Sequence, residues 1–210
     1  QKSEPLVSVL LPVFNVEKYL EECLDSVLNQ SLKNIEIICI NDGSTDKSFS
    51  ILTKYASVYP QIVIINQKNQ GLAIARNNAL KIAKGKYVLC VDSDDWIRQD
   101  TLQKLVEKME KFNYDMLSFS GLNFDDKTRD VSVNSYWMFE YLPKTFTEEL
   151  FTYKDCEGFQ SKMAVSSCLT VYRREFLDKH GIRYPDGLCF EDNVFFLKAI
   201  MNADRCGITR

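Results

Sequence analysis

The 210-residue sequence has few of the residues on which many familiar binding sites depend. It contains eight glycines, and the closest two, Gly181 and Gly187, are six positions apart. The G-x-G-x-x-G dinucleotide fingerprint and the G-x-x-x-x-G-K phosphate loop are therefore absent, since both bring backbone amides to phosphate at tighter glycine spacings. A nucleotide, if one binds, must be held in another way.

Histidine is scarcer still, because His180 is the only one in the chain. This excludes sites that need two imidazoles, such as H-E-x-x-H zinc sites, and leaves little room for nucleophiles that histidine activates. Catalysis would therefore depend on carboxylates, or on a metal ion that carboxylates hold.

A charge excess and a long apolar run are also missing. Lys and Arg number 26 against 29 Asp and Glu, so we expect no nucleic-acid-binding surface, which would need clustered positive charge. No run approaches the ~18 apolar residues of a membrane-spanning helix, and this segment carries no signal-peptide pattern. The seven cysteines form no C-x-x-C and fall mostly in apolar stretches, which favours a reducing, cytoplasmic location.

What is present is an alternation of short β-branched runs with helical patterns. The patterns predict strands at 7–11, 35–40, 62–65, 87–91, 116–119 and 166–172, and helices at 17–29, 47–59, 72–83, 100–112, 174–180 and 192–203. Pro12 is expected to end the first strand, and residues 121–160 are expected to be irregular. Such alternation predicts an α/β fold with a mostly parallel sheet covered on both faces, in which ligands bind at the carboxyl ends of the strands.

Three carboxylates follow the fourth predicted strand within four positions, at Asp92, Asp94 and Asp95. Two such charges about 4 Å apart at a protein–water boundary repel by about 4 kcal/mol, and a divalent cation would convert that repulsion into binding. Oxygen ligands favour Mg²⁺ or Mn²⁺. A solvated turn that caps the next helix is an equally good interpretation of the spacing alone, but Trp96 favours a site because an aromatic side chain has no capping role.

Asp42 and Arg76 each have an ordinary interpretation that is stronger when the residue is taken alone. Asp42 lies in an Asn-Asp-Gly-Ser turn, where its carboxylate can accept the imide N–H of uracil while Ser44 reaches nearby polar atoms, or where the turn simply caps a helix. Arg76 follows Gly71 on a predicted helix, from which it can reach a diphosphate or remain a surface arginine.

The pair Glu191-Asp192 precedes an apolar helix. Acidic residues are common at helix starts because the helix dipole favours them there. The functional interpretation is that one carboxylate is a general base for an alcohol, since the sequence offers almost no histidine for that task.

Taken together and in order, these motifs resemble the family 2 inverting glycosyltransferases, which have the GT-A fold. The resemblance depends on five segments, at 9–15, 41–46, 69–77, 92–95 and 191–192. It implies a Rossmann-like, mostly parallel sheet flanked by helices within one catalytic domain, residues 1–210. Residues 1–100 would be the nucleotide-sugar-binding half, and 101–210 the less regular half with the acceptor site and the base. The length indicates a catalytic core cut from a longer protein.

The resemblance also implies roles for individual residues. Those that bind the nucleotide sugar would be Pro12, Val13, Phe14, Asn15, Glu17, Asp42, Ser44, Gly71, Arg76, Asp92 and Ser93. Asp94, with Asp92, would bind Mn²⁺ or Mg²⁺ as part of a D-x-D motif. Asp95, Trp96 and Glu191 would lie at the acceptor, and Asp192 would be the catalytic base.

The function that follows is transfer of one sugar from a UDP-sugar to a hydroxyl group, by direct displacement with inversion. The acceptor would be a glycan or a lipid-linked oligosaccharide in cell-surface polysaccharide synthesis, at the inner face of the membrane if the protein associates with it. Asn41 stands where many family members carry an acidic residue, and no Q-x-x-R-W motif of processive synthases is present. The alternatives are a nucleotidyltransferase that acts on sugar phosphates and a pseudoenzyme that only binds nucleotide sugars; the sequence does not indicate an oligomeric state.

Overall fold

The structure, a computed structural model, describes residues 4–140, 142, 146, 150–156 and 165–210. Seven strands form one sheet in the order β3-β2-β1-β4-β8-β5-β9. Their bounds are Val7–Val13 for β1, Ile35–Asp42 for β2, Ile62–Gln67 for β3, Tyr87–Cys90 for β4, Met116–Phe119 for β5, Thr170–Arg173 for β8 and Cys206–Thr209 for β9. Pairing is parallel for β1–β2, β1–β4, β2–β3 and β5–β9, and β8 runs antiparallel between β4 and β5. The expected mostly parallel α/β sheet is confirmed.

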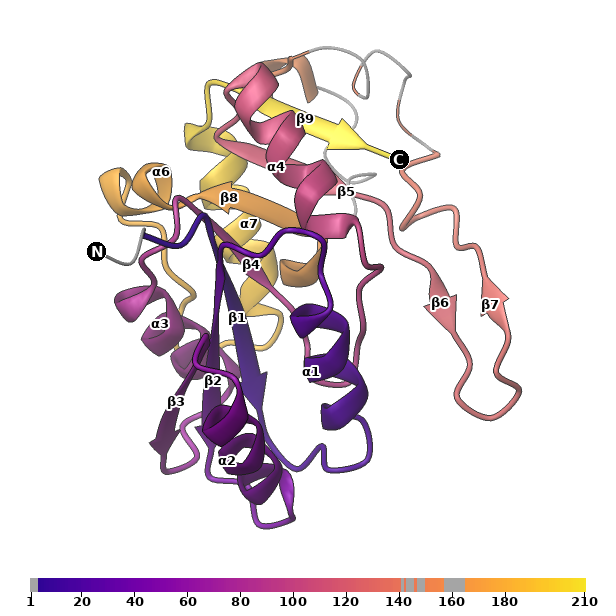
Figure 1. Ribbon diagram of the computed structural model, residues 1–210. Coiled ribbons are helices and arrows are strands. Elements are labelled where there is room, and N and C mark those ends of the chain that lie inside the picture. Colours follow the sequence, from indigo (N-terminus) through magenta and orange to yellow (C-terminus); the bar gives the residue numbers. More distant parts are fainter. Residues whose placement is uncertain (1–3, 141, 143–145, 147–149, 157–164) are drawn as a thin grey trace.

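Helices cover both faces of this sheet (Figure 1). They are α1 (Leu20–Leu28), α2 (Ser48–Val58), α3 (Leu72–Ile82), α4 (Thr101–Phe112), α6 (Arg174–Lys179) and α7 (Glu191–Asn202), with 3-10 turns at Tyr153–Cys156 and Ser167–Leu169. Successive side chains of a strand point to opposite faces, so Val9 and Leu11 of β1 pack with α1, α2 and α4, whereas Leu10 packs with α3, α6 and α7. Burial on both sides explains why β1 and β2 are almost continuously apolar.

The expectation that Pro12 ends the first strand was wrong, because β1 continues to Val13. Leu10 accepts a hydrogen bond from the amide of Val91 at 3.0 Å, so alternate residues of β1, including Pro12, face β4. The pairing of β1 with β4 stops at Leu10. The N–H that Pro12 lacks therefore falls beyond the end of β4, where no ladder bond is lost.

Two further differences concern the second half. Strand β9 has no counterpart among the predicted elements, and the strand predicted at 166–172 is a 3-10 turn, Ser167–Leu169, followed by β8. Within the expected irregular excursion, β6 (Asn123–Phe124) and β7 (Val131–Ser132) form a hairpin that projects from the body of the protein (Figure 1). Residues 141, 143–145, 147–149 and 157–160 of that excursion lie outside the described residues.

No helix within the described ranges combines the length and the apolar character needed to cross a membrane.

Candidate active site

A cavity of about 380 Å³ opens at the carboxyl edge of the sheet, where β1, β2 and β4 end. The chain reverses its winding direction here, because β2 and β3 lie on one side of β1 and β4 on the other. Open α/β sheets bind ligands at such a point. The described residues that line the cavity are Pro12, Val13, Phe14, Asp42, Asn69, Gly71, Leu72, Ala75, Asp92, Ser93 and Asp94.

The lining brings together eight residues that the sequence placed at a nucleotide-sugar or metal site, drawn from four separate segments of the chain. It adds Asn69, Leu72 and Ala75, which belong to the 69–77 motif but were given no role. The motif was the available signal for these three, since helix α3 begins inside it and presents its first turns to the cavity.

Asn15, Glu17 and Ser44, which the sequence placed at the nucleotide, join two loops beside the cavity. Asn15 Oδ1 accepts from the Thr45 amide at 2.8 Å, and Ser44 Oγ accepts from the Asn15 amide at 3.2 Å. Glu17 Oε2 accepts from the Lys47 amide at 2.8 Å. These bonds fix the loop after β1 against the loop after β2, so the three side chains shape the cavity wall without being part of the described lining.

Asp42 lies at the end of β2, is 4% exposed and contacts the loop before α3. Its Oδ1 accepts from Gln67 Nε2 at 2.8 Å and from the Gln70 amide at 2.9 Å, and its Oδ2 accepts from the Gly71 amide at 2.9 Å. Gly71 adopts φ +91°, a backbone conformation that favours glycine. The carboxylate thus holds the turn that starts α3, and one lone-pair position on Oδ2 remains for a further donor.

A group of possible metal ligands lies beside the cavity. Asp92, Asp95 and Cys168 each offer one ligand atom, and these atoms lie within 4.8 Å of one another. Asp94, which the sequence placed at the metal, lines the cavity but is outside this group. Loss of hydration, together with the charges of Asp92 and Asp94, raises the pKa of Asp95 to about 6. The negative charge that these carboxylates gather in one place is what a divalent cation would neutralise.

Arg76 is buried beneath the cavity, with 4% of its side chain exposed. Its Nη2 donates to Asp92 Oδ1 at 2.9 Å and its Nη1 donates to Glu191 Oε1 at 2.8 Å. The sequence placed this guanidinium at a diphosphate, but within the described part of the chain it does not line the cavity. It instead joins the end of β4 to the first residue of α7.

Asp192 follows Glu191 in the first turn of α7, and its Oδ1 accepts from the amide of Asn193 at 3.0 Å. The residue is half-buried. It lies near Tyr172 of β8, whose pKa is raised mainly by burial and in part by the charge of Asp192. Its second carboxylate oxygen has no partner among the described residues, so it can accept a proton.

Trp96, which directly follows Asp95, pairs with an aromatic ring of the β6–β7 hairpin. Trp96 is 43% exposed and meets Phe124 of β6 edge to face, with ring centroids 6.1 Å apart. Lys18 and Tyr19 bind Asp126 in the β6–β7 turn, Tyr19 at 3.2 Å, so this hairpin is held against the start of α1. The sequence gave no role to Phe124 or to Cys168, because neither belongs to a recognisable motif.

Comparison with known proteins agrees with this geometry. The family model for glycosyl transferase family 2 matches residues 8–181. Over 208 residues the chain is 33% identical to EpsJ of Bacillus subtilis (strain 168), an uncharacterized glycosyltransferase. The matched region covers 96% of this chain and 58% of EpsJ.

Two solved structures share the fold. Residues 1–349 of TarS from S. aureus, in complex with UDP-GlcNAc, match with a TM-score of 0.76 and 28% identity over 96% of this chain and 55% of that one. The mannosyltransferase PcManGT from Pyrobaculum calidifontis, in complex with GDP-Man and Mn²⁺, matches with a TM-score of 0.70 and 23% identity over 100% of this chain and 56% of that one, and supports the fold alone. The chain therefore spans little more than half the length of EpsJ, of the TarS 1–349 fragment and of the PcManGT chain.

Proposed function

The chain belongs to glycosyl transferase family 2, and from that premise we propose that it transfers a sugar from a UDP-sugar to an acceptor hydroxyl group with inversion at the anomeric carbon. The observation that carries the proposal is the cavity at the strand ends, where residues of four separate motifs meet around one space. Its volume of about 380 Å³ is within the usual range for small-ligand sites. The TarS complex with UDP-GlcNAc supports a uridine nucleotide as the donor.

The two ends of the cavity suit the two ends of such a donor. At one end, the free lone-pair position of Asp42 can accept the imide N–H of uracil. At the other end, Asp92 and Asp94 line the wall where a diphosphate would lie. Carboxylates alone would repel a diphosphate, so the donor needs a cation between them.

The residues present fit Mn²⁺ or Mg²⁺, because Asp92 and Asp95 bring two carboxylates together and Asp94 adds a third beside them. Such an ion supplies charge neutralisation for the leaving diphosphate when it is bound. Arg76 bonds Asp92 at Oδ1 and the Cys168 thiol lies within reach of the same carboxylate, so an ion would share Asp92 with both side chains. The chain's own contribution is to keep these carboxylates close together where β4 ends.

The shifted pKa of Asp95 predicts how metal and pH act on stability. Its ordinary value is 3.8 and its folded value is about 6, so ionising Asp95 opposes folding, and the stability present below pH 4 is lost as pH rises through 6. We expect Mn²⁺ to raise the unfolding temperature more at pH 7 than at pH 5, as measured by calorimetry. Asp95→Asn should remove most of this difference, whereas Asp130→Asn on the exposed hairpin should keep it. An equal Mn²⁺ effect at both pH values would contradict the prediction.

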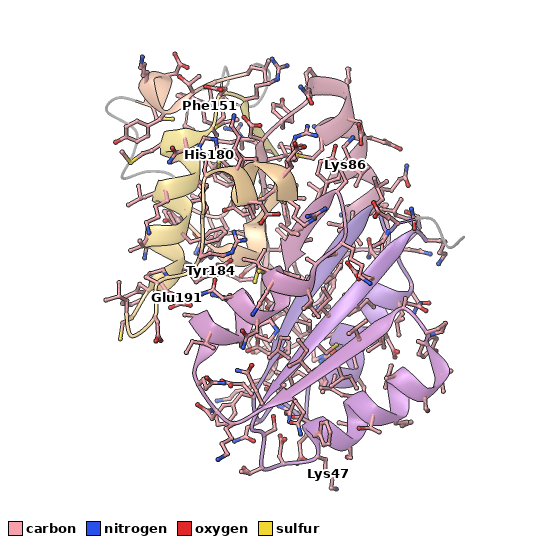
Figure 2. The ribbon with its side chains drawn as sticks, turned by 90° about the vertical axis from the view of Figure 1, so that its left-hand side faces the viewer. Lys47, Lys86, Phe151, His180, Tyr184 and Glu191 are labelled. Atoms are coloured by element: carbon pink, nitrogen blue, oxygen red, sulfur yellow. The ribbon has the colours of Figure 1, made fainter. Side chains whose placement is uncertain are left out.

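In the reaction itself, Asp192 takes the proton of the acceptor hydroxyl as the acceptor oxygen attacks the anomeric carbon. A bond forms between these two atoms while the bond from the anomeric carbon to the β-phosphate oxygen breaks, and its electron pair leaves with UDP. Attack from the face opposite the leaving group inverts the configuration, and no covalent sugar–enzyme intermediate is needed. A carboxylate is the available base because the one histidine of the chain, His180, lies at the end of α6 with its ring against Phe176, and Figure 2 shows it away from Glu191, where α7 begins.

The acceptor proposed here is a glycan or a lipid-linked oligosaccharide. Exposed aromatic rings offer apolar faces with polar surroundings, which suit a sugar ring, and Trp96, which directly follows Asp95, provides such a face. A role in cell-surface polysaccharide synthesis, transfer of a single sugar, and association with the inner face of a membrane are parts of the same proposal.

The test is a panel of UDP-, GDP- and CDP-sugars incubated with the protein and simple glycan acceptors, with Mn²⁺, Mg²⁺ or a chelator. We expect metal-dependent release of UDP from at least one UDP-sugar and an inverted anomeric configuration in the product by NMR. Release of pyrophosphate from UTP and a sugar phosphate would favour the nucleotidyltransferase alternative. UDP binding by calorimetry without turnover across the panel would favour a pseudoenzyme.

A further inference from the structure

Arg76 links two functional regions that are far apart in the sequence. Asp92 lies at the end of β4 and lines the cavity, whereas Glu191, 115 positions after Arg76, begins α7. Both bonds are charge-assisted and short, at 2.9 and 2.8 Å, and Glu191 is itself 12% exposed. One guanidinium therefore fixes a donor-side carboxylate and the residue directly before the proposed base.

Asn77, the residue after Arg76 on α3, strengthens the same connection between α3 and the start of α7. Asn77 Nδ2 donates to the Tyr184 carbonyl at 2.8 Å, and Asn77 Oδ1 accepts from the Tyr184 amide at 2.9 Å. The Tyr184 ring stacks on the ring of Phe195 in α7, with ring centroids 4.0 Å apart, and the Arg76 guanidinium carbon lies 5.3 Å from the centroid of the Tyr184 ring. Figure 2 shows Tyr184 and Glu191 close together where α7 begins. Two consecutive residues of α3 thus hold both the loop before α7 and its first turn.

We propose that Arg76 is a positioning residue, which holds Asp92 and Glu191 in a fixed relation and so places Asp192 opposite the donor, rather than a residue that touches the diphosphate. The inference depends on the proposed function for the identity of the base. It explains why an arginine is needed, since its planar fork can bond two carboxylates at once, whereas a lysine is a single point charge.

The geometry argues against direct contact with the donor. Arg76 already donates to Glu191 through Nη1 and to Asp92 through Nη2, and its buried Nε has no partner among the described residues. Only 4% of the Arg76 side chain is exposed and it is not among the described residues that line the cavity, so the guanidinium would have to leave its buried position between Asp92 and Glu191 to reach a diphosphate there.

The experiment compares Arg76→Lys, Glu191→Gln and the Arg76→Lys/Glu191→Gln double variant with the wild type. For Arg76→Lys we expect kcat to fall about 10- to 100-fold, the size of effect expected when reacting groups are misplaced by about 1 Å. The affinities for UDP and UMP, measured by calorimetry, should change by the same small factor, because neither phosphate loses a contact. The kcat of the double variant should resemble that of the worse single variant, since both changes break one linkage.

Hydrogen exchange supplies a readout that does not depend on turnover. Amides of 184–194 should exchange faster in Arg76→Lys and Glu191→Gln, even if no donor is found and the proposed function fails. The matched control is Arg174→Lys, because Arg174 bonds Gly85 and Asp178 away from the cavity and should leave kcat and this exchange unchanged. Loss of UDP affinity without loss of UMP affinity, unchanged exchange at 184–194, or multiplicative effects in the double variant would each overturn the proposal.

Discussion

Asp192→Asn is expected to reduce kcat about 1,000-fold while leaving UDP binding within about threefold of the wild type, because a positioned general base contributes roughly 10²- to 10⁴-fold. The substitution keeps the size of the side chain and an oxygen that can accept from the Asn193 amide. It removes the negative charge from the first turn of α7, which costs about 0.3–1 kcal/mol of helix stability. A change of that size cannot unfold the protein, so a large loss of kcat would report on chemistry.

The control for this variant is Asp186→Asn, an exposed residue in the loop that leads to α7. It removes the same charge six positions away and should leave kcat unchanged. Steady-state UDP release and calorimetric UDP affinity are measured for both variants. If Asp192→Asn kept more than a tenth of wild-type kcat, Asp192 would not be the base.

Most of the first half of the fold could be predicted from the sequence, because its signals are local. Strand β2 is an apolar run, interrupted by Glu36 and ended by a polar turn, and the buried side chains of α1, at Leu20, Cys23, Leu24 and Val27, recur at helical spacing. Strand β9 carries no such signal, since it has four residues, Cys206–Thr209, and one of them is Gly207. A Cβ at Gly207 would lie 2.4 Å from the ring of Tyr114, so this glycine is required by a contact that the sequence does not reveal.

The membership of the candidate site could also be predicted in large part from the sequence. Motifs at strand ends identified residues that meet in the cavity, since carboxyl ends of neighbouring parallel strands share one edge. They could not show which side chains pair. The bond from Arg76 to Glu191 and the approach of Cys168 to Asp92 and Asp95 depend on how α7 and β8 pack, and no local pattern encodes those distances.

Asp42→Ala is expected to lower both the stability of the protein and its affinity for UDP, the second-largest effect after that of Asp192→Asn. The buried Asp42 carboxylate holds the loop before α3 and, in the proposed function, faces the donor. The change leaves the amides of Gln70 and Gly71 and the Gln67 side chain without their acceptor. Losing hydrogen bonds to a charged, buried group should lower the free energy of unfolding by about 2–4 kcal/mol, measured by urea denaturation. UDP affinity should fall about 100-fold or more, because the turn that begins α3 is part of the cavity wall.

Asp42→Asn separates the two effects. Its one amide oxygen can replace Oδ1, which accepts from Gln67 and Gln70, so stability should fall by only about 1 kcal/mol. The amide NH₂ then occupies the position of Oδ2, where it faces the Gly71 amide and the imide N–H of uracil. The wild type should therefore bind UDP more tightly than CDP, whose base lacks that N–H, and Asp42→Asn should reduce this ratio of affinities about tenfold in calorimetric titrations.

The control is Asp46→Ala, which frees the amides of Glu17 and Ser48 near the same loops. It should lower the free energy of unfolding without altering the ratio of UDP to CDP affinity. An unchanged ratio in Asp42→Asn would assign Asp42 to loop structure alone, since the uracil contact is the one interaction that this ratio reports.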